Sequence, residues 1–251
     1  MSSDIWTRCG GNSEIGPLAA DPWRVVEAEH QIATRKLVGS DADQALLEEV
    51  LERYKPPLAD GAPVHYLLIT PFRYPPLPQG SRFGTRGERG IWYGAEALGT
   101  AFAEVAYYRL LFLDGTDAEL DPLAAELTAY HVPLQTRRGV DLTGTPFARF
   151  RSTLASKTSY AATQPLGAAM RDAGVEAFRY DSARDVAGGV NIGIFDPHAF
   201  ASRRPRGLQT WRTVATPAVV ELSRRDYFER GAFRFPREQF LVDGALPRPA
   251  V

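Results

Sequence analysis

The pattern of hydrophobic and polar positions is most regular in the middle of the chain. Apolar and aromatic residues occupy most positions between Leu98 and Leu113, which predicts a helix with few polar faces, and Thr100 is a suitable cap. A further helix is predicted from Thr163 to Gly174, a glycine that suits the left-handed position after a helix. Short apolar runs predict strands at residues 65–70, 91–93, 129–134, 175–180 and 190–195. Strands that alternate irregularly with helices indicate an α+β fold.

The two ends of the chain differ from the middle in pattern. Residues 1–20 contain glycine and serine and are expected to be loosely ordered. Asp21 and Pro22 then resemble a helix start, and Ser40 with Asp43 resembles a capping box that begins a second helix. We therefore predict three segments, namely an N-terminal extension of largely two helices (1–60), a core (61–200) and a C-terminal extension packed on the core (201–251). The two N-terminal helices most simply cover the sheet, although a homodimer contact or a docking surface for an inhibitor would suit them as well.

Composition and charge narrow the class of protein. The chain has 251 residues, of which 44% are hydrophobic and 24% charged, so it can bury a full globular core. Its net charge of −1 provides no overall field that would attract nucleic acid or a membrane surface. Cys9 is the only cysteine, which excludes an intrachain disulfide, and no secretion signal or membrane-spanning run is visible. We expect a cytoplasmic protein.

Common metal and nucleotide motifs are missing from the sequence. The four histidines are scattered and no HExxH or cysteine-rich spacing occurs, so no metal site is predicted. The chain also lacks the glycine-rich signatures of P-loop and Rossmann proteins. Any nucleotide must therefore be held in another way.

Glu104 is the first candidate for chemistry. It is the only carboxylate between Glu96 and Asp114, within the apolar helix predicted above. An enclosed carboxylate needs a partner or a task, and cations from the preceding loop are the partners that the sequence suggests.

That preceding loop is rich in arginine. Arg73, Arg82, Arg86 and Arg89 are opposed only by Glu88. Guanidinium groups match phosphate oxygens in a bidentate way, so some of these side chains are suited to hold a pyrophosphate. Arg86 and Arg89 fit an ordinary solvated loop better, whereas Arg73 and Arg82 adjoin aromatic residues and are the stronger candidates.

Four further residues are candidates on weaker local grounds. Tyr93 ends a predicted strand and is able to stack on a flat ring, although an ordinary core tyrosine would look the same. Ser182 lies in a turn where a hydroxyl often binds only local backbone, and it lacks the glycines of a hydrolase nucleophile elbow. Asn191 follows two glycines and would support a pocket or merely the turn, and Phe83 adjoins Arg82.

Taken together, these residues resemble the RES domain over about residues 65–200, within the predicted core. That family is named after an arginine, a glutamate and a serine. The resemblance rests on the order and spacing of short segments, namely Arg73, Gly80–Phe83, Ile91–Tyr93, Ala101–Val105, Tyr180–Arg184 and Asn191–Ile192. The predicted catalytic residues are therefore Glu104, Arg82 and Ser182, and the predicted substrate-binding residues are Arg73, Tyr93, Phe83 and Asn191.

The resemblance implies a fold, an activity and a partner. The fold is an ADP-ribosyltransferase-like core of short mixed or antiparallel strands with flanking helices. The activity is that of a toxin-like enzyme, a glycohydrolase or phosphorylase that cleaves the nicotinamide–ribose bond of NAD⁺ and depletes the cell of it. NAD⁺ is the substrate, and neither a metal nor a true cofactor is required. An Xre-type antitoxin is the implied partner protein.

Five of the predicted residues then have a role in that reaction. Glu104 stabilises the positive charge that develops on the ribose when nicotinamide leaves. Arg82 and Arg73 hold the pyrophosphate, and Tyr93 stacks on the cationic nicotinamide ring. Ser182 hydrogen-bonds the nicotinamide or its ribose.

Two other functions remain open. A protein mono-ADP-ribosyltransferase would use the same pocket, because the acceptor (water, phosphate or a protein side chain) leaves no signature in the sequence. A non-enzymatic module whose arginine loop binds nucleic acid or a partner protein is the alternative of another class, supported by basic clusters at residues 73–89 and 203–206. The near-neutral net charge favours an enzyme with no direct contact to nucleic acid or membrane.

Overall fold

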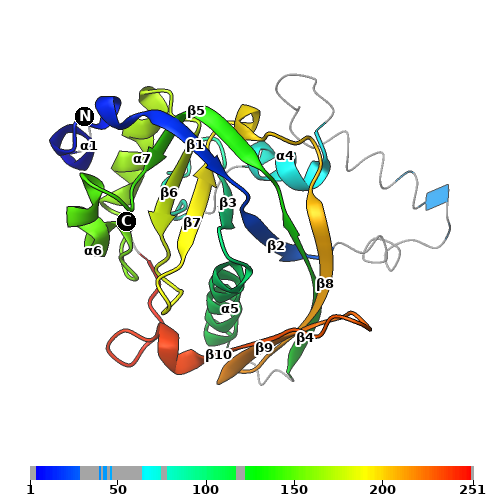
Figure 1. The fold of residues 1–251 in the computed structure, drawn as a ribbon. Coiled ribbons are helices and arrows are strands. Elements are labelled where there is room, and N and C mark those ends of the chain that lie inside the picture. Colours follow the sequence, from blue (N-terminus) through cyan, green and yellow to red (C-terminus); the bar gives the residue numbers. More distant parts are fainter. Residues whose placement is uncertain are drawn as a thin grey trace.

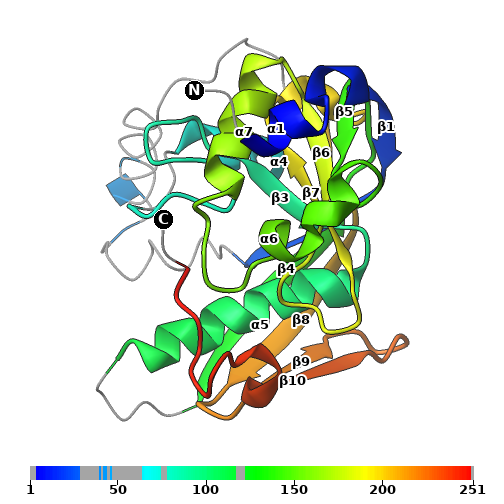
Figure 2. The ribbon, with the colours of Figure 1, turned by 90° about the vertical axis from the view of Figure 1, so that its left-hand side faces the viewer.

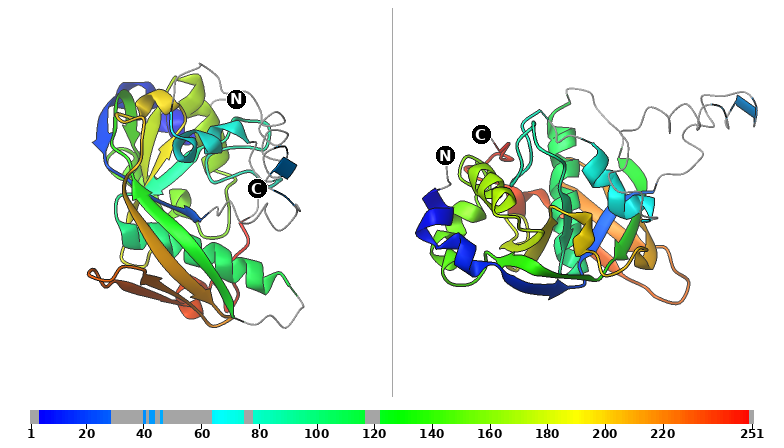
Figure 3. Two further views of the ribbon diagram at one scale, coloured as in Figure 1. Left: turned by 90° about the vertical axis from the view of Figure 1, so that its right-hand side faces the viewer. Right: turned by 90° about the horizontal axis from the view of Figure 1, so that it is seen from above.

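A single curved sheet is the framework of the molecule. The computed structural model describes residues 4–28, 40, 42–43, 46, 64–74, 78–116 and 122–249. Within them ten strands pair in the order β1-β5-β6-β7-β3-β2-β4-β8-β9-β10. Their bounds are β1 Gly16–Ala20, β2 Trp23–Glu27, β3 Trp92–Ala95, β4 Leu123–His131, β5 Leu134–Asp141, β6 Ala177–Asp181, β7 Val190–Ile194, β8 Arg206–Ala215, β9 Val219–Arg224 and β10 Ala232–Pro236. All neighbours are antiparallel except β5 and β6, and the long strands β4 and β8 run side by side (Figure 3).

Helices cover different parts of this sheet. The described α-helices are α1 Asp4–Arg8, α4 Tyr66–Arg73, α5 Leu98–Asp114, α6 Arg151–Leu154 and α7 Thr163–Asp172, and the short 3₁₀ turns are η1 Gly11–Glu14, η2 Phe147–Phe150, η3 Pro197–Ala199 and η4 Arg237–Phe240. The sheet curls around α5, which lies between the β3 region and β8–β10 (Figures 1 and 2). Helices α1 and α7 gather at the opposite, β5–β6 end of the sheet (Figure 2). The predicted α+β fold is confirmed.

Three apolar clusters hold the layers together. Helix α7 and helix α1 bury residues such as Met170 and Trp6 against β5 and β6. Helix α5 buries Phe102 and Leu110 against β8 and β9. Helix α4 buries Leu68 against the middle of the sheet. The almost wholly apolar character of α5 thus has a simple reason, because strands surround much of its circumference.

The N-terminal prediction was wrong where the structure describes it. Residues 4–27 form α1, η1, β1 and β2 instead of a loose tail, and the segment after Asp21 and Pro22 is a strand rather than a helix. Strand β2 pairs along its length with β4, about a hundred residues later, so its conformation depends on a distant partner. The rest of the first predicted helix lies outside the described residues. Of the second, the described Ala42, Asp43 and Leu46 are helical, and Ser40 Oγ accepts a hydrogen bond from the Asp43 amide as a capping box requires.

Residues 66–73 form a helix, α4, where a strand was predicted. Pro71 lies inside this helix and has no amide proton, so it is unable to donate to the carbonyl of Leu67 one turn earlier. The hydroxyl of Tyr130 donates to that carbonyl instead, at 2.8 Å. A tertiary contact therefore stabilises a helix that its sequence disfavours.

The remaining predictions in the core are largely confirmed. Helices α5 and α7 and strands β3, β6 and β7 lie where they were expected, and Gly174 has the left-handed φ of 72°. The cap of α5 is Ala97 rather than Thr100. The single strand expected at residues 129–134 is instead two strands, β4 and β5, joined by a tight connection.

The sheet opens in its middle, and this opening positions the candidate site. Strands β2 and β3 share a single register pair, Trp23 with Ala95, whereas each pairs extensively on its other side. Beyond that pair the two strands diverge. Strands from the predicted N-terminal, core and C-terminal segments all join this one sheet, so the ends of the chain are part of the framework around the opening.

Candidate active site

A cavity of about 1100 Å³ lies where β2 and β3 diverge. Its walls come from β2, β3, α4, α5 and the loop before β3, and residues of the β6–β7 region complete it. Four arginines line it (Arg24, Arg82, Arg184 and Arg248), together with the carboxylates Glu27 and Glu104 and the tyrosines Tyr66, Tyr74, Tyr93, Tyr108, Tyr160 and Tyr180. The space is large enough for a ligand of dinucleotide size.

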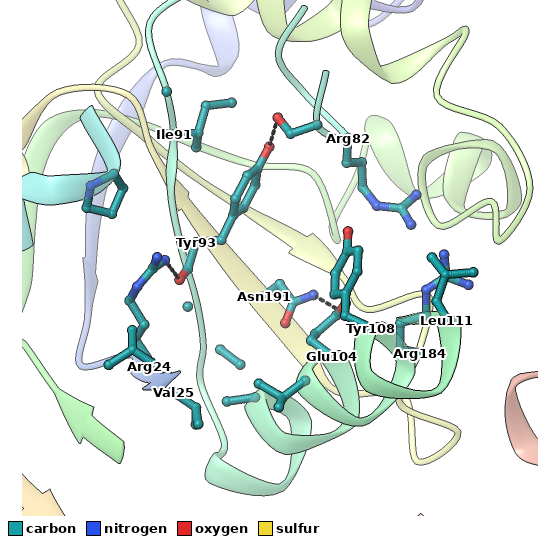
Figure 4. Close-up of a pocket in the computed structure, with 18 of the residues that line it drawn as sticks. Arg24, Val25, Arg82, Ile91, Tyr93, Glu104, Tyr108, Leu111, Arg184 and Asn191 are labelled. Carbon is teal, nitrogen blue, oxygen red and sulfur yellow. Dashed lines mark hydrogen bonds between the residues drawn. The ribbon is translucent and has the colours of Figure 1, made fainter. Parts of the chain in front are cut away.

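Glu104 projects from the second turn of α5 into this cavity. Its Oε1 accepts hydrogen bonds from Ser182 Oγ and from Asn191 Nδ2, each at 2.7 Å. Figure 4 shows the bond from Asn191. The expected cationic partners are not there, because Glu104 forms no ion pair within the described part of the chain. Two neutral donors orient the carboxylate through one oxygen, and among the described residues Oε2 receives no hydrogen bond. A carboxylate held by neutral donors is not offset by a paired cation.

Ser182 lies in the turn between β6 and β7, and its hydroxyl is fully used. It accepts from the amides of Arg184 and Asp185, both at 3.1 Å, and donates its proton to Glu104. The local-backbone interpretation of Ser182 is thus partly right, and the contact with Glu104 adds a second role. Because Ser182 is buried and does not line the cavity, it positions Glu104 rather than facing a ligand.

Tyr93 lines the cavity from β3, with its hydroxyl turned toward the preceding loop. The hydroxyl lies 3.0 Å from Ser81 Oγ and accepts a hydrogen bond from the Phe83 amide (Figure 4). Burial raises the pKa of Tyr93 to about 12. The phenol therefore stays protonated at neutral pH, and its ring is fixed against the cavity wall with a single orientation.

Arg82 lines the opposite side of the cavity from Arg24 (Figure 4). Its Nη1 donates to the carbonyls of Leu154 and Ser156, at 3.0 and 2.8 Å, and its guanidinium lies 5.0 Å above the ring of Tyr160. No carboxylate pairs with it among the described residues. Arg82 is therefore a buried, anchored cation at the site, as the sequence suggested.

Two predicted residues lie elsewhere. Arg73 is the last residue of α4 and is not among the residues that line the cavity. Phe83 is fully buried and packs edge-on against Phe178 and Tyr180, so it supports the wall from behind instead of touching a ligand. Arg86 is exposed, in agreement with the solvated-loop interpretation.

Arg24 and Arg184 are among the cavity residues that the sequence reasoning missed. Arg24 Nη1 donates to the carbonyl of Tyr93 at 2.6 Å, across the gap between β2 and β3. Burial lowers the pKa of Arg24 from its ordinary value. Its signal was present, a single charge within the apolar run Trp23–Val26, but a helical interpretation of that segment concealed it. Arg184 was noticed only as part of the motif around Ser182.

Two kinds of feature are not found among the described residues. They contain no group of three or more His, Cys, Asp or Glu side chains that would hold a metal ion. None of the helices that the structure describes is long and apolar enough to cross a membrane.

A family model supplies the decisive comparison. The model of the RES domain matches residues 57–215, which is more than half of the chain. The chain belongs to the RES domain family. The matched range of this RES domain includes Arg82, Glu104, Ser182 and Asn191 but begins after β2 and Arg24. The cavity of this RES domain therefore has one wall that lies outside the matched range.

One solved structure and a search of curated proteins complete the comparison. The RES domain described here is similar to the M. tuberculosis MbcT–MbcA toxin–antitoxin complex, known from a crystal structure. The TM-score is 0.47 and the identity 13%, and the similarity covers 85% of this chain and 92% of that one. No curated protein matches the chain.

Proposed function

We propose that this RES domain cleaves the nicotinamide–ribose bond of NAD⁺. The observation that carries the proposal is the placement of Glu104, a carboxylate fixed by Ser182 and Asn191 at the wall of a cavity that arginines and tyrosines otherwise line. This combination suits a substrate with phosphates at one part and a cationic ring at another.

The chemical step follows from the charges. Nicotinamide leaves NAD⁺ as a neutral base and takes the electron pair of the C–N bond, so positive charge moves onto the ribose, as in glycoside cleavage. Glu104 provides a fixed negative charge for that centre, and its two neutral donors keep the carboxylate aligned without cancelling its charge. An oxygen of the acceptor then forms the new bond to the ribose carbon, and when the acceptor is water it releases one proton to the solvent.

The other cavity residues bind and orient. The Tyr93 ring provides a fixed aromatic face for the cationic nicotinamide ring. Arg82 provides a cation for phosphate oxygens. We do not assign this task to Arg73, which the sequence suggested for it, because Arg73 is not among the residues that line the cavity.

We further propose that the protein acts as a toxin and that an Xre-type antitoxin is its partner. The support comes from the family and from the mouth of the cavity. Four cavity residues there expose large apolar surfaces, namely Tyr66, Tyr74, Tyr108 and Phe112. Exposed aromatic side chains around a cavity are suited to a protein partner, either an inhibitor or an acceptor for ADP-ribose. A protein mono-ADP-ribosyltransferase therefore remains the second candidate.

The test is a time course of NAD⁺ with purified protein, followed by NMR in the presence and absence of phosphate and of a cell extract. Release of nicotinamide is expected, and the second product identifies the acceptor. Glu104→Gln should raise the activation free energy by at least about 2.7 kcal/mol, which lowers the rate roughly a hundredfold, because the amide lacks the charge of the carboxylate. Glu221→Gln, an exposed carboxylate on β9 away from the cavity, is the matched control and should keep full activity.

Two results would contradict the proposal. The three conditions are the protein alone, the protein with phosphate and the protein with cell extract as a source of protein acceptors. Unchanged NAD⁺ in all of them would exclude cleavage with any of these acceptors. Full activity of Glu104→Gln would remove Glu104 from the mechanism. Salt-dependent binding to nucleic acid that Glu104→Gln leaves unaffected would instead support the non-enzymatic module.

A further inference from the structure

Arg184 is the most deeply buried cation of the site. Only 2% of its surface is exposed, although it lines the cavity. Its Nη2 donates to the carbonyl of Lys157 at 3.2 Å, while its Nη1 is enclosed and has no hydrogen-bond partner. An enclosed guanidinium nitrogen without an acceptor is costly, so its presence beside a cavity points to an acceptor that a ligand supplies.

Arg184 is also a neighbour of Arg82. The two guanidinium groups donate to carbonyls of one short segment after α6, Arg82 to Leu154 and Ser156 and Arg184 to Lys157. Figure 4 shows both side chains on the same side of the cavity. One short stretch of backbone therefore places two cations close together and leaves their other N–H groups for a further partner.

No protein anion balances this pair in the described part of the chain. Neither arginine forms an ion pair there, and each instead has an aromatic ring on one face. Arg184 lies 3.5 Å from the centre of the Tyr107 ring, and Arg82 lies 5.0 Å from that of Tyr160. The rings stabilise the charges without occupying the in-plane donors. Two adjacent buried like charges repel each other, and a bound dianion would remove that repulsion.

We propose that Arg82 and Arg184 together form the binding site for the diphosphate of the substrate, with Arg184 as a specificity-determining residue. The chemistry fits, because two guanidinium forks present several donors to the oxygens of a diphosphate. The inference deepens the proposed function, since NAD⁺ would be the source of that diphosphate. It also assigns to Arg184 the task that the sequence gave to Arg73.

The test measures binding and needs no turnover. Titration calorimetry at constant ionic strength compares ADP with adenosine, which differ only by the diphosphate. We expect the wild type to bind ADP at least about tenfold more tightly than adenosine, and Arg184→Met to lose most of that difference. Arg184→Lys keeps the charge and one donor but lacks the fork, so an intermediate difference is expected if Arg184→Met fails to fold. Arg86→Met, an exposed loop arginine outside the cavity, should behave as wild type.

Each outcome decides the question. An equal affinity of the wild type for ADP and adenosine would overturn the proposal, and so would an undiminished ADP preference in both Arg184 variants. Adenosine affinity that falls as much as ADP affinity would show that Arg184 only supports the fold.

A separate arm with inorganic phosphate distinguishes the source of the anion. Phosphate that binds as tightly as ADP and displaces it would assign the pair to free phosphate instead of the substrate. A diphosphate preference in a protein that does not cleave NAD⁺ would refute the proposed function and leave this site in place.

Discussion

At the scale of single residues, the orientation of Glu104 depends on donors that carry no charge. Ser182 Oγ and Asn191 Nδ2 both bind Oε1, from the turn before β7 and from β7 itself. A cationic partner would have neutralised the carboxylate, whereas these neutral donors fix its orientation and leave it without a paired cation. The serine that the family name emphasises thus donates its hydroxyl proton to the glutamate in this chain.

Tyr93 allows a prediction about the effect of pH on stability. Burial raises its pKa to about 12 in the folded protein, compared with about 10 in an unfolded chain. Between these values the unfolded chain releases the proton while the folded protein retains it, so raising the pH favours unfolding. The stabilisation from Tyr93 is complete below pH of about 10 and is lost as the pH rises toward 12. The urea concentration at the midpoint of unfolding should therefore fall less steeply with rising pH for Tyr93→Phe than for the wild type across this window.

The control for that experiment is Tyr227→Phe, at an exposed hairpin tip. Its pH profile should follow the wild type. Profiles of Tyr93→Phe and wild type that run parallel from pH 9 to 12 would show that the Tyr93 phenol ionises as easily in the folded protein as in the unfolded chain. The hydroxyl would then not be enclosed between Ser81 and the Phe83 amide.

At the scale of elements, the 182–189 turn is fastened to the first turns of α5 at two points. One is the contact between Ser182 and Glu104. The other is a 2.7 Å hydrogen bond from Thr100 Oγ1, which is fully buried, to Asp185 Oδ2. Thr100 and Glu104 are one helical turn apart on the same face. Gly189 permits this closeness, since a Cβ there would lie 2.1 Å from Thr100 Oγ1.

We expect Thr100→Val to lower kcat for NAD⁺ cleavage about tenfold with little change in KM. The substitution preserves shape but removes the donor to Asp185, so the turn loses one of its two attachments and Ser182 no longer holds Glu104 in a single orientation. Thr100→Ser retains the hydroxyl and should restore kcat. Steady-state kinetics of the purified variants measures both parameters.

Thr213→Val is the matched control, because Thr213 is equally buried and its hydroxyl has no hydrogen-bond partner in the described structure. It should leave kcat unchanged. A normal kcat for Thr100→Val, or a loss that Thr100→Ser shares, would mean that the link between Thr100 and Asp185 does not position the carboxylate.

At the scale of the whole molecule, the sequence predicts the elements that carry Glu104, Ser182 and Asn191 better than it predicts α4 and β2. Helix α5 and strands β6 and β7 follow from local patterns, whereas the sequence suggested cations, and not Ser182 and Asn191, as the partners of Glu104. Helix α4 was not predicted, because its apolar run suits a strand equally well. The helix also tolerates Pro71 only because the distant Tyr130 hydroxyl donates to the Leu67 carbonyl. NAD⁺ as the substrate was suggested only by the family resemblance, and its cleavage is a proposal.

The same reasoning explains why one wall of the site was missed. Strand β2 has no clear alternation of its own, and it becomes a strand by pairing with β4. Without β2 the sequence offers no reason to place Arg24 at the cavity, and Arg73 is the better candidate. Tertiary pairing, rather than local propensity, decides such segments.

The opening between β2 and β3 yields a final prediction about Arg24. Where the strands diverge, the carbonyl of Tyr93 has no partner from β2 backbone, and Arg24 Nη1 bridges to it at 2.6 Å. Arg24→Met leaves this carbonyl unsatisfied beside the cavity and should lower the free energy of unfolding by about 1–3 kcal/mol. Arg24→Lys provides one donor and should recover part of the loss, while Arg86→Met, exposed in the loop, should cost little. Urea unfolding of the three variants measures these differences. If Arg24→Met is as stable as the wild type, the bridge from Arg24 to the Tyr93 carbonyl does not stabilise the fold.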